Sequence, residues 1–183
     1  MTSITHAAPR DARLRAVGII GFAAAVAAAS QIAIPLPFTP VPITLQPMLV
    51  ILAGMWLGPV EGAASMTLYL AAGALGLPVF TPLGPTGVAR FLGPTGGYLI
   101  AYPVAAYVAG ALSRRAGSFW SRWLAGLAGI AVIYIGGLSQ LTLLNGSLSR
   151  AIALGVTPFA AVDILKAWIA AALTTPRGSR RGG

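Results

Sequence analysis

The sequence contains no cysteine and a single histidine, His6, near its N-terminus. Without cysteine the chain cannot form a disulfide, a thiolate nucleophile or a cysteine-ligated metal site. One histidine and three acidic residues in 183 positions give no cluster of metal ligands. We therefore expect neither a metal nor a cofactor.

Lysine is equally rare, because Lys166 is the only one and it follows Leu165. A P-loop needs a lysine followed by serine or threonine after a glycine-rich turn, so the chain cannot be a P-loop ATPase by itself. Any ATP hydrolysis linked to its activity would have to be performed by partner subunits. Charged residues of all kinds make up 8% of the chain, compared with about 25% in soluble domains.

Apolar residues take the place of the missing charges. They make up 57% of the chain, and the mean hydropathy is +0.83. The first apolar segment resembles a signal peptide because arginines precede it, but it is too long and others follow, so we interpret it as a retained helix. The pattern predicts an all-α integral membrane protein, a single domain over residues 1–183. Its six transmembrane helices are expected at residues 14–34, 44–57, 60–77, 97–112, 123–144 and 158–173.

Arginine placement predicts the orientation in the membrane. Nine of the eleven arginines fall on the side that both termini share, and Arg90 and Arg150 fall on the opposite side. Because basic residues are enriched in cytoplasmic loops, both termini are expected in the cytoplasm, with tails at residues 1–13 and 176–183. This distribution accounts for the net charge of +9 without nucleic-acid binding.

Three loops, at residues 35–43, 78–96 and 145–157, are then expected to face outward. The first places prolines at close intervals around Phe38, which favours a stiff, extended path and suggests a lid. The second contains Leu-Gly-Pro-Thr-Gly twice, which specifies consecutive turns. The alternative is that both loops are turn chemistry alone.

The second apolar segment is unusually short. As a helix, residues 44–57 rise only about 20 Å, less than the roughly 30 Å hydrocarbon core of a bilayer. Its outer end should be recessed, so Thr44 and Gln46 would lie at the floor of an outward depression. Pro47 fits a first helical turn, and Thr44 could equally be only an N-cap.

Two charged residues meet inside the last apolar segment. Asp163 and Lys166 lie at i and i+3 on one helix face. Counted from Pro158 at 1.5 Å per residue, they lie roughly 8 and 12 Å below the outer end. A charge at that depth costs about 2.5 to 3.5 kcal/mol, so such residues face a protein interior or a wet cavity and mark a functional site. A purely structural ion pair is the alternative.

Arg90 lies between the duplicated turns of the second outer loop, on the same side as Asp163, which suggests a cationic group at a cavity mouth. An ordinary solvated arginine is the alternative. A carboxylate, an ammonium and a guanidinium together would suit an amphipathic acid with a polar head. Asp11 in the tail and Glu61 at a helix N-terminus receive no role in the site.

The first apolar segment carries a dense set of small residues. Its alanines form overlapping Ala-x-x-x-Ala pairs, which allow a second helix to approach closely. A partner helix, inside or outside the chain, is implied. The expected docking residues are Ala23, Ala24, Ala27 and Ala28.

Four motifs occur in order along the chain. They are Pro-Phe-Thr-Pro-Val-Pro-Ile-Thr-Leu-Gln at residues 37–46, Gly-Leu-Pro-Val-Phe at 76–80, Gly-Pro-Thr-Gly-Gly-Tyr-Leu at 93–99 and Pro-Phe-x-x-x-Asp-x-x-Lys at 158–166. Their combination resembles BioY, the biotin-binding S component of energy-coupling factor (ECF) transporters. The resemblance runs from the first helix to the last.

This resemblance implies a six-helix substrate-capture subunit, not an enzyme, in the plasma membrane of a prokaryote. It implies a transmembrane coupling subunit, onto which the alanine face docks, and two cytoplasmic ATPase subunits. The leading hypothesis is outward-facing capture of biotin for uptake. Asp163 and Lys166 would hold the ureido ring, Arg90 would neutralise the valerate carboxylate, and the 35–42 loop would close over the site. Tyr98 from the third motif is expected to join Thr44 and Gln46 as a substrate-binding residue.

Other functions stay open at this stage. The chain could be an S component for another vitamin or small carboxylic acid. An integral membrane enzyme could use Asp163 and Lys166 as an acid–base pair. A purely structural subunit is a third possibility.

Overall fold

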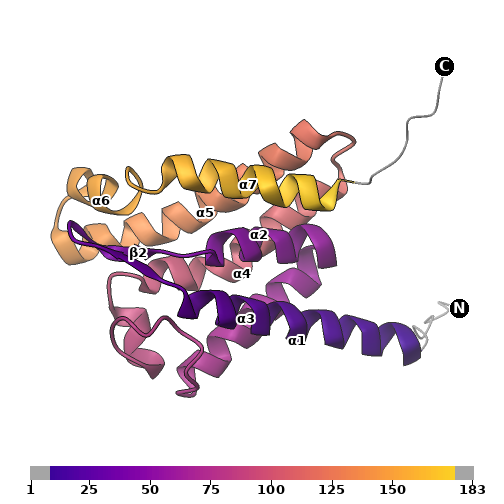
Figure 1. Cartoon of the computed structure of the whole chain (residues 1–183), viewed down its shortest axis with the longest axis horizontal. Coiled ribbons are helices and arrows are strands. Elements are labelled where there is room, and N and C mark those ends of the chain that lie inside the picture. Colours follow the sequence, from indigo (N-terminus) through magenta and orange to yellow (C-terminus); the bar gives the residue numbers. More distant parts are fainter. Residues whose placement is uncertain (1–8, 176–183) are drawn as a thin grey trace, which may run out of the picture.

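The computed structural model describes residues 9–175, and nearly all of its regular structure is helical (Figure 1). Apolar segments broken by glycine and proline account for most of the boundaries. Gly58, with a φ of 100°, separates two helices, and Pro47 and Pro59 lie in the first turns that follow. The elements in chain order are α1 (Pro9–Gln31), β1 (Ile34–Leu36), β2 (Thr39–Ile43), α2 (Gln46–Leu57), α3 (Pro59–Ala74), the 3₁₀ helix η1 (Gly87–Leu92), α4 (Gly96–Arg114), α5 (Phe119–Asn145), α6 (Leu148–Gly155) and α7 (Ala160–Thr174).

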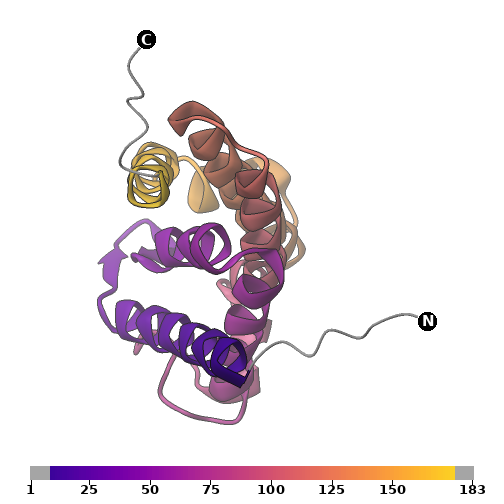
Figure 2. The same cartoon turned by 90° about the vertical axis from the view of Figure 1, so that its right-hand side faces the viewer.

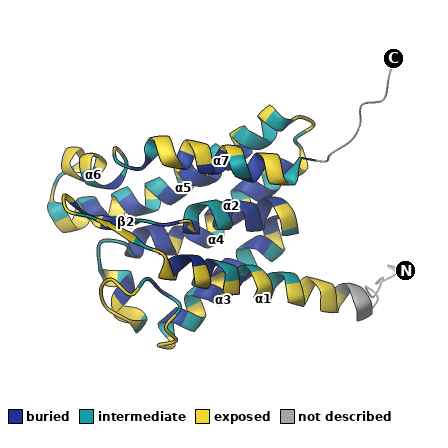
Figure 3. Cartoon of the chain, in the orientation of Figure 1, coloured by how far each residue is buried: buried dark blue, intermediate teal, exposed yellow. Residues whose placement is uncertain are grey.

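The helices fit a multi-pass membrane protein. Within the described part of the chain, α1, α4 and α5 are each long and apolar enough to cross a bilayer, and α6 and α7 qualify together as a pair bent by 56°. Large apolar side chains also cover much of the outside, including Leu14 at 70% and Leu143 at 82% exposure, and Figure 3 shows such exposed positions along α1, α6 and α7. Lipid, rather than water, is the solvent that suits this surface.

Several predicted boundaries were wrong. Helix α1 begins at Pro9, so residues 9–13 of the expected tail are helical, whereas residues 1–8 and 176–183 lie outside the described residues. The expected loop at 145–157 contains helix α6, which Ser147 caps by accepting a hydrogen bond from the Arg150 backbone N–H. A helix of eight residues is too short to cross the bilayer, so a search for apolar spans passes over it. The expectation of an all-α chain also missed the small hairpin β1–β2.

The elements separate into two ends. In Figure 1 the start of α1 and the end of α7 both lie toward the right, whereas the hairpin and α6 lie at the left. Figure 2 shows α2 between α1 and α7, with α4 and α5 in a second layer to the right of these three helices. Helix α2 contacts all four of these neighbours, and most of its residues are buried. The shortest predicted span is therefore the centre of the helical assembly.

Close backbone contact holds α2 against α4. A β-carbon on Gly54 would collide with the carbonyl oxygen of Ala106, and one on Gly110 would collide with the carbonyl oxygen of Gly54. Glycine is required at such approaches because any side chain would force the helices apart. The assembly below the hairpin is thus tightly packed.

A side-chain hydrogen bond from Thr39 attaches the hairpin to α6. Its two strands run antiparallel, with Leu36 paired to Thr39. The closely spaced prolines had predicted the extended path of this segment, but not its pairing into a hairpin. The Thr39 hydroxyl donates to the carbonyl oxygen of Leu154 over 2.7 Å. Two of the three outward loops predicted from the sequence therefore meet at this end of the molecule.

Candidate functional site

A cavity lies beneath the hairpin, among α2, α3, α4, α5 and α7. It encloses about 640 Å³ of empty space, counting its open mouth, which is within the roughly 300–1,000 Å³ of small-molecule sites. Apolar and aromatic side chains supply much of its wall, and polar groups are interspersed among them. The polar lining residues are Thr44, Gln46, Tyr69, Thr81, Arg90, Thr95, Tyr98, Tyr102, Tyr134, Asp163 and Lys166.

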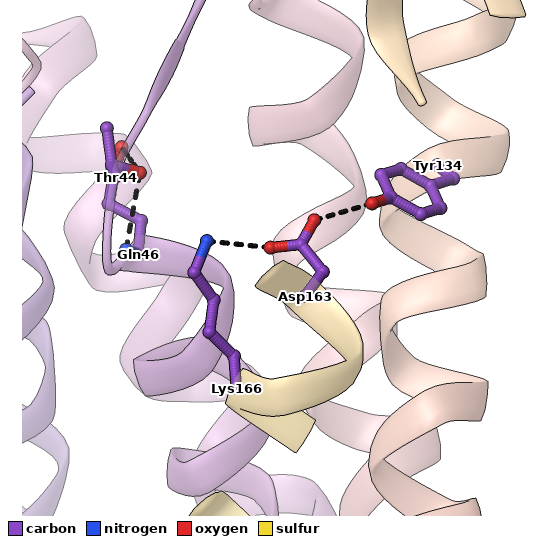
Figure 4. Close-up of polar contacts among 5 residues, drawn as sticks. All are labelled: Thr44, Gln46, Tyr134, Asp163 and Lys166. Atoms are coloured by element: carbon purple, nitrogen blue, oxygen red, sulfur yellow. Dashed lines mark hydrogen bonds and ion pairs between the residues drawn. The ribbon is translucent and has the colours of Figure 1, made fainter. Parts of the chain in front are cut away.

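Asp163 and Lys166 form the charged centre of one wall. The Lys166 Nζ donates to Asp163 Oδ1 over 2.6 Å, and the two residues are only 5% and 4% exposed, respectively. The Tyr134 hydroxyl, on α5, donates to the other carboxylate oxygen, Oδ2, over 2.6 Å. Figure 4 shows Asp163 between the ends of these two side chains. Both carboxylate oxygens are thus paired, and Lys166 retains N–H groups beyond the one it gives to Asp163.

The depth of this pair has a different origin from the one predicted. Helix α7 begins at Ala160, not at Pro158, so Asp163 lies in its first turn. Because α6 and α7 are bent by 56°, α7 starts inside the protein, where Asp163 is buried. A helix N-terminus favours a carboxylate through the partial positive charge of its free N–H groups. The helix break therefore sets both the depth and the electrostatics of Asp163.

Thr44 and Gln46 line the cavity at the start of α2, as expected. The N-cap of α2 is Leu45, so Thr44 does not occupy that position. The Thr44 hydroxyl donates to Gln46 Oε1 over 3.3 Å, and Gln46 Nε2 donates to the Tyr69 hydroxyl oxygen over 2.7 Å. These contacts fix the orientation of the Gln46 amide at the cavity floor.

Arg90 lines the cavity but is not a solvated arginine at its mouth. The residue is 4% exposed, because the loop wraps around it: Nη1 donates to the Leu83 carbonyl and Nη2 to the Thr81 carbonyl. The guanidinium carbon lies 6.0 Å from the centre of the Phe80 ring. Burial lowers the pKa of Arg90 from its ordinary value, yet that value is so high that the group stays charged.

One nitrogen of Arg90 has no partner within the described chain. The buried Nε makes no hydrogen bond to residues 9–175. A buried N–H without a partner costs about 1–3 kcal/mol, more when the group is charged. Arg90 lines the cavity as a residue, although its Nε atom is itself buried from solvent.

Tyr98 and the hairpin define the side of the cavity nearest α6. The Tyr98 hydroxyl donates to the Gly155 carbonyl over 2.9 Å, and a β-carbon on Gly155 would collide with that hydroxyl. Phe38 is 59% exposed and is not among the lining residues, which on the hairpin side are Val41, Pro42 and Ile43. The hairpin therefore covers the cavity with β2 and the residues after it, not with Phe38.

Sequence reasoning found Tyr98 but missed the other aromatic residues of the site. Tyr134, Tyr69 and Tyr102 line the cavity, and Phe80 packs edge-to-face on Tyr69 with ring centres 5.5 Å apart. Tyrosine within an apolar segment is a usable signal, because its hydroxyl needs a partner when buried. Which of these tyrosines faces Asp163 depends on how the helices are rotated, and that is a property of the fold.

The four alanines proposed for docking do not share one exposed face. Ala23 is 7% exposed and belongs to the core of this chain, and Ala27 packs against that core. Ala24 and Ala28 are exposed on the outer side of α1. Among the residues that the structure describes, no three metal-ligating side chains come together.

Comparison with known proteins identifies relatives over most of the chain. The model of the BioY family matches residues 4–181. A probable biotin transporter BioY from Pyrococcus horikoshii is 47% identical over 128 residues, which cover 70% of this chain and 75% of the relative. The biotin transporter BioY of Thermotoga maritima is 37% identical over 138 residues, covering 75% and 81%.

A solved structure agrees with these relatives. The crystal structure of the S-component for biotin from an ECF-type ABC transporter superposes with a TM-score of 0.85 and 26% identity, over 92% of this chain and 93% of the other. The names of the relatives describe transport proteins, so the expectation that the chain is not an enzyme is confirmed. By the family match and by its relatives, this multi-pass membrane protein belongs to the BioY family.

Proposed function

We propose that this chain captures biotin in the cavity beneath the hairpin and serves its uptake as the S component of an ECF transporter. The observation that carries the proposal is the buried Asp163–Lys166 pair in the cavity wall; among the described residues the one other buried charged residue, Arg90, lines the same cavity. A buried ionised pair in a membrane protein is costly and by default marks a substrate site. The names of the relatives supply the substrate.

The ureido ring of biotin suits the Asp163 wall. Its two N–H groups need acceptors and its carbonyl needs a donor, which a carboxylate and an ammonium provide. Lys166 can turn a free N–H to the carbonyl while keeping its bond to Asp163. Tyr134 holds the second carboxylate oxygen and so keeps the plane of the carboxylate fixed toward the cavity.

The carboxylate of biotin suits Arg90. The buried Nε–H has no partner within residues 9–175, and a charged N–H···O⁻ bond is roughly twice as strong as a neutral one. The apolar body of biotin would then lie against Tyr69, Tyr102 and Ile133. The residues after Thr39 close the cavity from above while the hydroxyl of Thr39 holds the hairpin to α6.

Mass spectrometry of the ligand carried through purification tests the substrate directly. We expect unmodified biotin, and we expect biotin to displace a labelled biotin probe at concentrations at least about 100-fold below those needed for other vitamins. Equal displacement by a second vitamin or by a small carboxylic acid would assign the site to that compound instead.

Substitutions at the charged pair test the site. Asp163→Asn and Lys166→Met should each weaken biotin binding by about 100-fold, because each leaves a buried charge or polar group unpaired. Glu61→Gln is the matched control, since Glu61 forms a long ion pair with the exposed Arg15, at 3.6 Å. Binding is measured by calorimetry on protein that elutes as a single species.

Tyr134→Phe extends the same test. It removes one hydrogen bond to the carboxylate and should weaken binding by about tenfold, whereas Tyr107→Phe, on the exposed side of α4, should have no effect. If Asp163→Asn and Lys166→Met both bind biotin like the parent chain, the site lies elsewhere.

We further propose six membrane crossings with cytoplasmic termini, counting α6 and α7 as one broken span. The turn between α4 and α5, with Arg114 and Arg115, would face the cytoplasm and the hairpin would face outward. Because the chain has no cysteine, single cysteines report their side cleanly. A membrane-impermeant maleimide should label Phe38→Cys in intact cells and Gly117→Cys only after permeabilisation, and the reverse pattern would contradict this orientation.

The coupling subunit is proposed to dock on the outer face of α1, and two cytoplasmic ATPases would complete the transporter. Ala24 and Ala28 are exposed there one turn apart, and small residues allow close helix contact. Replacing both by leucine should abolish co-purification of the coupling subunit and leave biotin binding by the isolated chain unchanged. Ala131→Leu on the exposed side of α5 is the control, and retained co-purification by the α1 double variant would exclude this face.

A further inference from the structure

The C-terminal end of α1 makes side-chain contacts with the loop that follows α3. Ser30 is fully buried, and its hydroxyl oxygen lies 2.6 Å from the Val79 carbonyl oxygen. The Gln31 Nε2 lies 3.1 Å from the Phe80 carbonyl oxygen and 3.3 Å from that of Pro78. Two adjacent side chains of α1 thus lie within hydrogen-bonding distance of three consecutive backbone carbonyls. These carbonyls belong to residues 47 to 49 positions further along the chain.

The two side chains also hold each other. Gln31 Nε2 donates one N–H to the Ser30 hydroxyl oxygen over 2.8 Å, which leaves its second N–H to be shared among the Phe80, Pro78 and Ala27 carbonyls. The hydroxyl proton of Ser30 goes to the Val79 carbonyl or to the Ala27 carbonyl within α1. Residues 78–80 belong to no helix or strand, so their carbonyls have no ladder to accept from. Donors from α1 therefore fix a backbone segment that has no regular structure of its own.

This segment leads directly to the guanidinium of Arg90. Phe80 is 6% exposed and its ring lies under the Arg90 guanidinium. The next residue, Thr81, gives its carbonyl oxygen to Arg90 Nη2. A shift of the 78–81 backbone would therefore move both the ring and the carbonyl that orient Arg90 at the cavity wall.

We propose that Ser30 and Gln31 are positioning residues for the carboxylate end of the substrate site, acting through the 78–81 backbone on Arg90. The inference rests on the proposed function, in which Arg90 binds the carboxylate of biotin. Neither residue is among those that line the cavity, so an effect on ligand choice cannot come from direct contact. A buried hydroxyl and an amide that merely stabilise the fold would instead affect all ligands alike.

The test compares biotin with its carboxamide, in which a neutral amide replaces the carboxylate. The parent chain should prefer biotin because Arg90 pairs with a carboxylate more strongly than with an amide. The Ser30→Ala/Gln31→Leu variant should lower the ratio of the two affinities by about tenfold, mainly by weakening biotin. Ser30→Thr, which keeps a hydroxyl, should restore most of the ratio when Gln31 is intact.

Ser65→Ala is the matched control. Ser65 is also fully buried and also donates to α1, at the Ile19 carbonyl over 2.8 Å, but it makes no hydrogen bond to residues 78–81 within the described chain. It should leave the affinity ratio unchanged. If Ser65→Ala lowers the ratio as much as the double variant does, the effect is general loosening and the proposal is wrong.

Arg90→Met, which removes the positive charge, separates the proposal from the function on which it rests. An unchanged ratio in Arg90→Met would remove Arg90 from carboxylate binding and so correct the proposed function. A lowered ratio in Arg90→Met together with an unchanged ratio in the Ser30/Gln31 variant would overturn only the positioning role. Should the double variant not fold, the affinity ratio is measured for Ser30→Ala alone and compared with that for Ser30→Thr. A lower ratio in Ser30→Ala than in Ser30→Thr supports the positioning role, and equal ratios overturn it.

Discussion

The ion pair between Asp163 and Lys166 sets the constraint that the rest of the site satisfies. Removing two charges from water costs several kcal/mol per ion, and their attraction repays this only when the remaining hydrogen-bonding groups are also satisfied. Tyr134 supplies the second bond to the carboxylate, and the start of α7 adds the favourable end of a helix dipole. A buried pair is weak support for stability, since apolar residues of similar size often stabilise a protein as well. Its presence is more readily explained by ligand binding.

The backbone makes room for this pair at one end of the molecule only. Helix α2 has 12 residues and so begins below the outer surface, and the break between α6 and α7 leaves a second recess beside it. At the other end the close approach of Gly54 to α4 leaves no space between the helices. The cavity therefore lies on the hairpin side of the close contact between α2 and α4.

Sequence reasoning found the features that depend on composition and on spacing within one helix. Asp163 and Lys166 stood out as charges at i and i+3 in an apolar segment, and the short α2 indicated a recess at Thr44 and Gln46. It did not find features that depend on contacts between distant segments. Arg90 was expected at the mouth of the cavity, but it is buried and donates hydrogen bonds to two carbonyls of its own loop. Ala23 and Ala24 are adjacent in sequence, and only the rotation of α1 decides that one is buried and the other exposed.

The contacts that close the cavity differ in kind from those that hold the helices. The hairpin is held to α6 by one side-chain hydrogen bond, from Thr39 to Leu154, which contributes about 0.5–1.5 kcal/mol net, and Val41 is its single buried apolar residue in the core. Separating α2 from α4 would instead expose buried residues such as Val50 and Ile51, each worth roughly 1.5–3 kcal/mol. Local opening follows the lowest of these costs. We therefore infer that the hairpin is the part of the cavity wall that opens most readily, whereas hydrogen bonds from Ser30 and Gln31 tie the loop that carries Phe80 to α1.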